Sequence, residues 1–111
     1  MDDEHNFEAF CTAVERRDYE TALCLALPHA EAGNSDAQCA MGLLCGYGMG
    51  VPRSWELAEQ WLVRAAEQHN PVAWNNLGTL YSDVGNVEKA RQCYQRAKDL
   101  GFNCAHPYPP F

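Results

Sequence analysis

Apolar residues in this chain recur every three to four positions within six segments, and polar or glycine-containing breaks separate the segments. This spacing is the period of an amphipathic helix, because 3.6 residues make one turn. The pattern therefore predicts six helices, at residues 4–16, 18–32, 35–47, 54–69, 71–83 and 86–100. The remaining segment, 102–111, contains three prolines and is expected to be irregular.

Residues that commonly begin and end helices stand at the predicted boundaries. Asp18, Ser54 and Asn70 precede or open the second, fourth and fifth segments, where their side chains can accept hydrogen bonds from the first free amides. Gly33 and Gly101 follow the second and sixth segments, where glycine tolerates a left-handed backbone. These signals support the helix boundaries independently of the apolar period.

One pattern occurs twice, 36 residues apart: Met41-Gly42 is followed by Cys45, and Leu77-Gly78 is followed by Tyr81. Alanines at 22, 58 and 90 occupy the same place in the second helix of each predicted pair. A fixed period of 20 to 50 residues indicates stacked helical units that bury their apolar faces against neighbours. We therefore predict an all-α fold, a short right-handed α-solenoid of three antiparallel helix pairs with an irregular C-terminal tail.

The turn of the middle pair is four residues longer than the other two turns and reads GYGMGVPR. Glycines at 46, 48 and 50 are expected to supply positive φ values in this turn. Because the turn lacks a GK[ST] ending and follows a helix rather than a strand, it is not expected to bind phosphate.

Two known repeat families are similar to the second and third pairs. Residues 73–97 resemble a tetratricopeptide repeat at Trp74, Leu77, Gly78, Tyr81, Ala90, Tyr94 and Ala97. Residues 37–68 resemble the Sel-one-like repeat at Gly48, Gly50, Val51, Trp61, Ala65 and Ala66. The resemblance implies one domain over 1–111, with a degenerate capping pair (4–33), a Sel-one-like repeat (36–70), a tetratricopeptide-like repeat (71–101) and a tail (102–111). It also implies that Trp61 and Trp74 pack in the core, whereas Trp55, beside the glycine-rich turn, is expected to be partly exposed.

Charge is concentrated at one end of the chain. Residues 1–36 carry nine acidic and two basic side chains, whereas residues 37–111 carry six of each, and the formal net charge is −7. Nucleic acid is therefore not expected as a partner, because phosphate binding requires positive charge. A protein with a basic, or mixed basic and apolar, surface would complement the acidic end. The alternative is that these charges form a solvated face that aids solubility.

The composition also bears on compartment and chemistry. No apolar run approaches the length of a membrane span, and the first ten residues do not resemble a signal peptide, so we expect a cytoplasmic protein without a membrane partner. The six cysteines are then expected to be reduced and mostly buried. Neither zinc-ligand spacing nor a nucleophile-and-base set is evident, so no metal, cofactor or enzymatic activity is expected. A monomer is favoured.

Stacked helix pairs curve, and the tetratricopeptide register places the first helix of each pair on the concave side. The side chains predicted to face a partner there are Glu4, Phe7, Cys11, Glu15, Asp36, Cys39, Leu43, Tyr47, Asn75, Thr79 and Ser82. This set combines an acidic rim, an apolar centre and a polar far end, which suits a segment with a basic and an apolar anchor. The alternative is that the apolar members, such as Phe7 and Leu43, pack between helix pairs.

These observations favour a non-enzymatic protein–protein interaction module that acts as an adaptor, regulator or inhibitor. Small chains with Sel-one-like repeats often serve such roles in bacteria, as the resemblance implies. One specific hypothesis is an immunity-type inhibitor that masks a basic toxin. A second is a chaperone or targeting factor that holds a segment of an exported client, and a remote third is a hydrolase-like Sel-one-repeat protein. The aromatic and proline-rich tail is interpreted either as a lid over the last helix or as a ligand for a partner.

Overall fold

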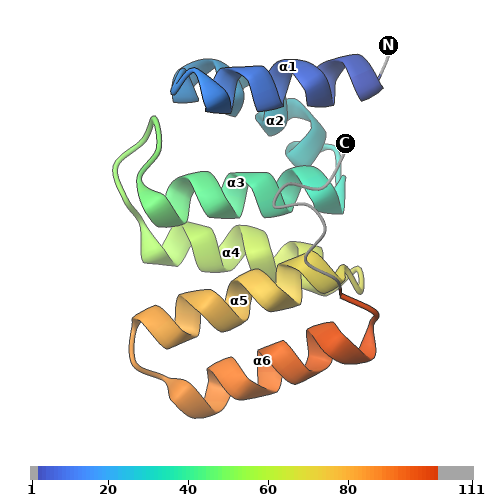
Figure 1. The fold of residues 1–111 in the computed structure, drawn as a ribbon, viewed down its shortest axis with the longest axis vertical. Helices are drawn as coiled ribbons and strands as arrows, with labels where there is room; N and C mark the ends of the chain where they lie inside the picture. The colour runs from blue at the N-terminus through green and yellow to red at the C-terminus, as the bar shows by residue number, and fades with distance from the viewer. Residues whose placement is uncertain (1–2, 103–111) are drawn as a thin grey trace.

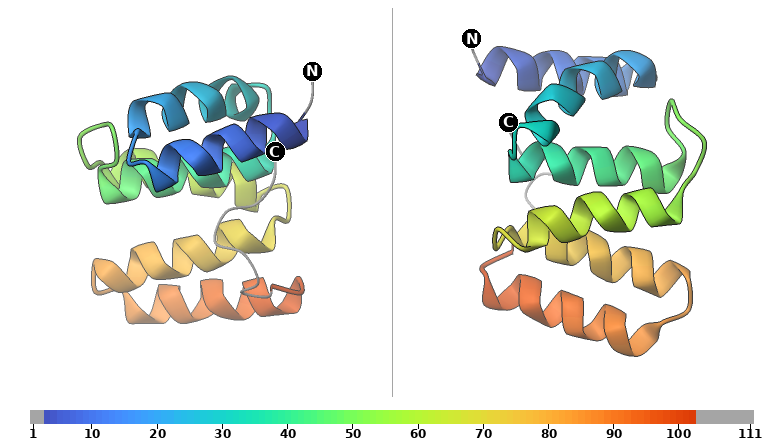
Figure 2. Two further views of the ribbon diagram at one scale, coloured as in Figure 1. Left: turned by 45° about the horizontal axis from the view of Figure 1, so that its top comes forward. Right: turned by 180° about the vertical axis from the view of Figure 1, so that it is seen from behind.

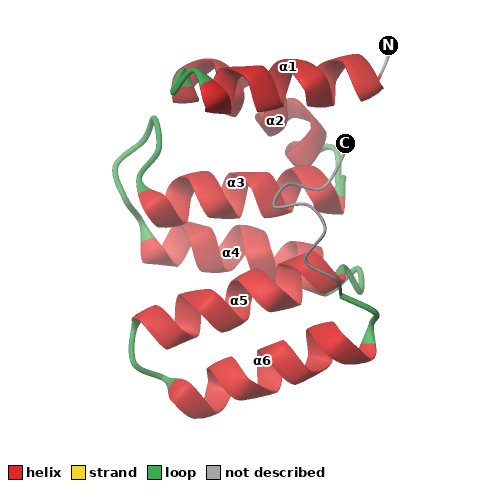
Figure 3. Cartoon of the chain, in the orientation of Figure 1, coloured by secondary structure: helices red, strands yellow, loops and turns green. Residues whose placement is uncertain are grey.

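The computed structural model describes the backbone of residues 3–102 and the side chains of residues 8–102. This part of the chain contains six helices and no strand: α1 Asp3–Glu15, α2 Tyr19–Glu31, α3 Ser35–Tyr47, α4 Trp55–Ala66, α5 Pro71–Asp83 and α6 Val87–Asp99 (Figure 3). All six predicted helices are confirmed. Only α4 differs by more than two residues at an end, because it stops at Ala66 and His69 takes a positive φ of 64°. The predictions for the tail beyond Phe102 lie outside the described residues.

The predicted helix caps are present. The Asp18 carboxylate accepts a hydrogen bond from the Thr21 amide at 3.4 Å, and the Ser54 hydroxyl accepts one from the Leu57 amide at 3.2 Å. The Asn70 side-chain oxygen accepts the amide of Val72 at 2.9 Å. Each cap satisfies an amide that has no partner within its own helix.

The helices follow one another along the longest axis of the molecule, which measures 38 Å (Figure 1). Consecutive helices run antiparallel, and the view from behind shows α2, α4 and α6 on the opposite side from α3 and α5 (Figure 2). The backbones of α3 and α5 approach each other directly, whereas among the described helices the backbone of α1 approaches only that of α2. The fold is thus the small all-α solenoid predicted from the sequence, with a first pair that is attached differently from the others.

Glycines at the repeated signature position allow the two helices of a pair to approach closely. A Cβ atom on Gly42 would lie 2.6 Å from the Leu62 side chain, and one on Gly78 would lie 2.7 Å from the Tyr94 ring. In the first pair this position is Phe10, which has no exposed surface. In the first pair, a buried ring therefore fills the space between α1 and α2. In the other two pairs, glycine lets the two helices approach closely, and no such space is left.

The long turn between α3 and α4 folds back against the first pair. Gly48 and Gly50 have φ values of +69° and +78°, as predicted. The same prediction for Gly46 is wrong, because Gly46 lies inside α3, where its missing side chain lets α3 approach Ala58. A Cβ on Gly50 would lie 2.9 Å from backbone and side-chain atoms of Tyr19 on α2. The turn therefore holds α2 as well as connecting α3 to α4.

The buried side chains form two clusters. The first core joins α1, α2 and α3 through Phe10, Ala13, Ala22, Ala26, Ala30, Ala37, Ala40, Met41 and Leu44. The second core joins α3 to α6 through Cys39, Cys45, Ala58, Leu62, Ala65, Ala66, Ala73, Leu77, Leu80, Tyr81, Ala90 and Cys93. The first core contains mostly alanine, whereas the second contains larger side chains and is flanked by the three tryptophans.

Cysteine and tryptophan burial follows the predictions only in part. Cys39, Cys45 and Cys93 are buried free thiols, as expected, but Cys11 is half-buried and Cys24 is exposed. Trp55 is half-buried, as predicted. Trp61 and Trp74 are also half-buried rather than fully enclosed, although Trp61 packs against both cores and Trp74 against the second.

Candidate functional site

A shallow hollow lies between α3 and α5, on the side where the first helices of the second and third pairs meet. We call it the α3–α5 hollow. Its walls include Leu43, Tyr47, Leu62, Asn76, Thr79 and Asp83. Its cavity volume is only about 20 Å³, so it is a shallow depression rather than an enclosed pocket. Gly42 and Gly46 also line it.

The two walls of this hollow differ in chemistry. On α3, Leu43 is half-buried and Tyr47 is 55% exposed, so this wall is apolar and accessible. On α5, the side-chain nitrogen of Asn76 is buried and has no hydrogen-bond partner among the described residues. An unmet buried donor costs free energy.

One carboxylate, Asp83, lines the hollow, and a second, Asp36, lies beyond its lining at the start of α3. Asp83 is exposed. Asp36 is half-buried on the first turn of α3, seven residues before Leu43 and therefore on the same face of the helix. Burial raises the pKa of Asp36, and a hydrogen bond from the Asn70 side chain at 2.7 Å opposes this increase. A cation from a ligand would meet a carboxylate at either of these two positions.

A buried polar network fixes the start of α3, which contains Asp36. The Gln38 side chain donates to the Ala30 carbonyl at 3.1 Å and accepts from the Gln68 side chain at 3.0 Å. The Asn70 side chain donates to Ser35 at 3.0 Å as well as to Asp36. These bonds link the end of α2, the start of α3 and the turn before α5, so the position of Asp36 is well defined.

The residues predicted to face a partner do not form one surface. Leu43, Tyr47 and Thr79 line the α3–α5 hollow, with Asp36 beyond its end. Asn75 and Ser82 instead line a separate hollow between α5 and α6. Glu15 is exposed at the end of α1, and the half-buried Cys11 packs against the first core. The side chains of Glu4 and Phe7 lie outside the described residues.

Cys39 is the residue whose position conflicts with the prediction. It has no exposed surface and belongs to the second core, because α5 packs directly against that side of α3. Burial, followed by the nearby Asp36 charge, raises the pKa of its thiol, so it remains a neutral thiol that packs as a small apolar group. It cannot contact a partner in this conformation.

Two polar residues of the hollow, Asn76 and Asp83, are not among the predicted residues, and neither are the glycines and buried leucines that complete its lining. Asn76 is adjacent to the predicted Asn75. The face of α5 that lines the hollow therefore lies one residue later in the sequence than the predicted face. Asp83 lies seven residues after Asn76, so a correct phase for α5 would have included both.

Other site types find no support in the described part of the chain. No group of three or more histidine, cysteine or acidic side chains is arranged there to hold a metal ion. No helix in residues 3–102 combines the length and apolar character needed to cross a membrane.

An array of antiparallel helix pairs with a hollow on the side of its first helices defines the class of helical-repeat, or α-solenoid, proteins. Residues 35–70 match the Sel1 repeat family and residues 71–101 match the tetratricopeptide repeat family. Residues 35–101 therefore contain one Sel1-like and one tetratricopeptide-like repeat. Repeats of these families are generally interaction modules rather than enzymes.

A curated relative supports the same assignment. The chain is 37% identical over 73 residues to tetratricopeptide repeat protein 37 of Xenopus laevis. The match covers 63% of this chain but only 4% of that protein. The chain thus spans only a small part of the length of that relative.

Proposed function

We propose that this protein binds an extended segment of a partner protein in the α3–α5 hollow and acts as a stoichiometric adaptor or inhibitor. The observation that carries the proposal is the arrangement of this hollow, in which two carboxylates, Asp83 in the lining and Asp36 beyond it, accompany an accessible apolar wall of Leu43 and Tyr47. The complementary segment has an apolar side chain for the centre and a basic side chain for one end.

The spacing of the two anchors follows from helix geometry. Asp36 and Leu43 are seven residues apart on α3, which corresponds to about 10 Å along the helix axis. An extended chain in the polyproline II conformation advances about 3.1 Å per residue and returns every third side chain to the same side, so three residues cover about the same distance. We therefore propose that the preferred ligand has a basic residue three positions from an apolar residue.

The acidic first third of the chain favours a partner of net positive charge. Unbalanced charge of this kind speeds the encounter with an oppositely charged protein and makes binding sensitive to salt. A more specific form of the proposal is that the chain acts as an inhibitor. It would cover a basic protein, such as a toxin that an immunity protein counters. The cytoplasm is the proposed compartment, in keeping with free thiols that pack as small apolar side chains.

The test uses short fluorescent peptides and fluorescence anisotropy at low salt. In one series, eight-residue peptides carry one leucine and one arginine separated by two, three or four positions, and in the other series glutamate replaces the arginine. We expect the three-residue spacing to bind most tightly and the glutamate series to bind at least about fivefold more weakly. Tyr47→Ala should weaken binding about tenfold, and Asp36→Asn should weaken it about threefold.

Leu57→Ala provides the matched control, because Leu57 is 47% exposed on α4, is comparable to Tyr47 in exposure, and lies outside the lining of the hollow. Its binding should equal that of the unmodified protein. The proposal would be abandoned if no peptide bound at millimolar concentration, or if Tyr47→Ala and Leu57→Ala had equal effects.

A further inference from the structure

The two ends of the helix stack carry opposite charge. α1 contains four acidic residues and no lysine or arginine, whereas α6 contains four basic and two acidic residues. These helices are the first and last along the longest axis, so the charges are separated by the length of the array (Figure 1). A charge distribution of this kind favours end-to-end attraction between two copies of the chain.

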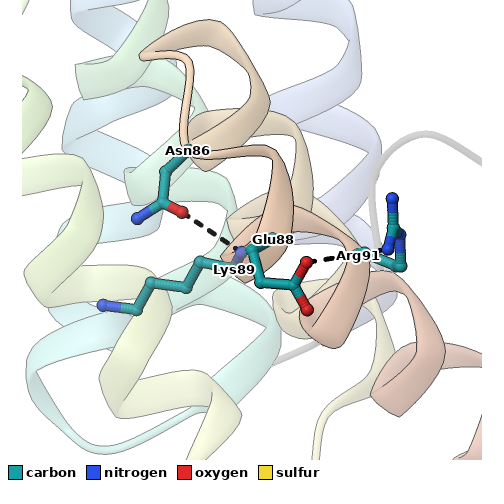
Figure 4. A network of polar contacts seen from close by, with 4 residues as sticks. All are labelled: Asn86, Glu88, Lys89 and Arg91. Atoms are coloured by element: carbon teal, nitrogen blue, oxygen red, sulfur yellow. Dashed lines mark hydrogen bonds and ion pairs between the residues drawn. The ribbon is translucent and has the colours of Figure 1, made fainter.

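The α6 end presents a basic stripe beside a hollow. Val87, Arg91, Tyr94 and Lys98 line the hollow between α5 and α6, and their spacing places them on one face of the helix. Val87 is 61% exposed and Tyr94 is 37% exposed, so apolar surface accompanies the charge. Arg91 lies 3.6 Å from Glu88 (Figure 4), but both side chains are 72% exposed. Such a pair is weak, and Arg91 can exchange it for another carboxylate.

The α1 end presents a complementary surface. Glu8 and Thr12 line a shallow hollow between α1 and α2 together with Arg16 and Asp18, and Glu15 is exposed seven residues after Glu8, on the same face of α1. Ala9 lies beside Glu8 in the lining and contributes a small apolar contact. Two carboxylates separated by seven residues on α1 thus match two cations separated by seven residues on α6.

The joint between α4 and α5 shows how such a contact would be arranged. Tyr81, near the end of α5, donates to Glu59 near the start of α4, so these antiparallel helices pair end to start. By the repeat alignment, Arg91 occupies the position of Glu59 in its own pair. By the same alignment Ala13 occupies the position of Tyr81, so an α1 that lay on α6 in this way would bring the end of α1 toward Arg91 and its middle toward Lys98.

We propose that a second copy of this chain docks its α1–α2 end onto the α5–α6 end of the first, so that copies stack head to tail and continue the solenoid. The contact uses different surfaces on the two copies and does not close on itself, so it produces chains of variable length rather than a fixed dimer. Because the contact is small and depends on exposed charges, it forms at high concentration and low salt, and the monomer predicted from the sequence remains the dilute state.

The experiment is sedimentation velocity over a wide range of protein concentration, at low and at moderate salt. For the unmodified chain, we expect the mean mass to rise above 12.4 kDa with concentration at low salt and to return to that value at moderate salt. The double variants Arg91→Glu/Lys98→Glu and Glu8→Lys/Glu15→Lys should each weaken association at least about tenfold. The quadruple variant that combines them should recover it.

The quadruple variant also provides the decisive control, because it keeps the formal net charge at −7. Recovery therefore reports the pairing of the two ends and not the overall charge. All four side chains are exposed, so circular dichroism and the thermal midpoint should be unchanged in every variant.

Three outcomes would overturn the proposal. The first is a constant mass of 12.4 kDa at every concentration. The second is association that both double variants retain. The third is a monomeric chain in which Arg91→Glu/Lys98→Glu lowers the thermal midpoint, because that would indicate that part of the same chain covers the α6 end.

Discussion

The joint between the first and second helix pairs and the joint between the second and third are built differently. In the first joint, the first core is mainly alanine, and the turn between α3 and α4 presses Gly50 against Tyr19. In the second joint, α3 and α5 pack directly, and the Tyr81 hydroxyl donates to Glu59 at 2.6 Å. Burial and the Glu59 carboxylate raise the pKa of Tyr81, so this phenol remains a hydrogen-bond donor.

Aromatic contacts add to the second joint. The Trp55 and Tyr81 rings meet edge to face with centroids 6.2 Å apart, and the Lys89 ammonium lies 4.6 Å from the centre of the Tyr81 ring. In a helical array, stability is approximately the sum of unit and interface contributions. The difference between the joints therefore indicates that the first pair opens before the other two.

The largest expected effect comes from breaking the first joint at Phe10. This ring is fully buried, so Phe10→Ala should cost the first pair about 3–5 kcal/mol. Hydrogen exchange should then become faster for the amides of α1 and α2, while protection in α5 and α6 is kept. Leu77→Ala in the second core is the matched variant, and it should instead accelerate exchange in α3 to α6. Equal acceleration of all helices by Phe10→Ala would mean that the array opens as one unit.

A smaller effect is expected at the turn that holds the first pair. Gly50→Ala combines an unfavourable φ of +78° with a clash against Tyr19, so it should destabilise the protein by roughly 2 kcal/mol. Gly85→Ala has a similar φ of +86° but nothing within 4 Å of its new Cβ, so it should cost about 1 kcal/mol. Urea unfolding measures both values. If the two substitutions cost the same, the turn makes no useful contact with α2.

The smallest effect concerns the polar part of the second joint. Because burial raises the pKa of Asp36, its ionised form is less favourable in the folded protein than in the unfolded chain. The penalty is present above that raised pKa and disappears as the pH falls through it toward about 3.9, the ordinary value. Asp36→Asn should therefore stabilise the fold at pH 7 and have little effect near pH 3.5.

The expected gain from Asp36→Asn is under about 1 kcal/mol, because the group is only half-buried and the start of α3 favours a carboxylate. Urea unfolding at the two pH values provides the measurement, with the exposed Asp83→Asn as the comparison. A loss of stability at pH 7 would show that the Asn70 hydrogen bond to the carboxylate outweighs its burial.

The helices were predictable because their signals are local. Asp18, Ser54 and Asn70 act as caps through residues two or three positions away, and the apolar period needs only one helix at a time. The hollow was harder to predict because it depends on how two helices pack. Cys39 and Asn76 lie on the same helices as predicted residues that line the hollow, yet direct packing of α5 on α3 buries the first and brings the second into the wall. Gly46 shows the same limit, since helix contact and turn formation both favour glycine.

The turn between α3 and α4 has a consequence for the modularity of the array. By sequence it belongs to the second repeat, but Gly50 and Met49 pack on the first pair and its core. If the second repeat were exchanged at the boundaries that the sequence indicates, the exchange would therefore also remove the turn that packs on the first helix pair. Recombination or design that treats this chain as interchangeable units should transfer the turn together with α1 and α2.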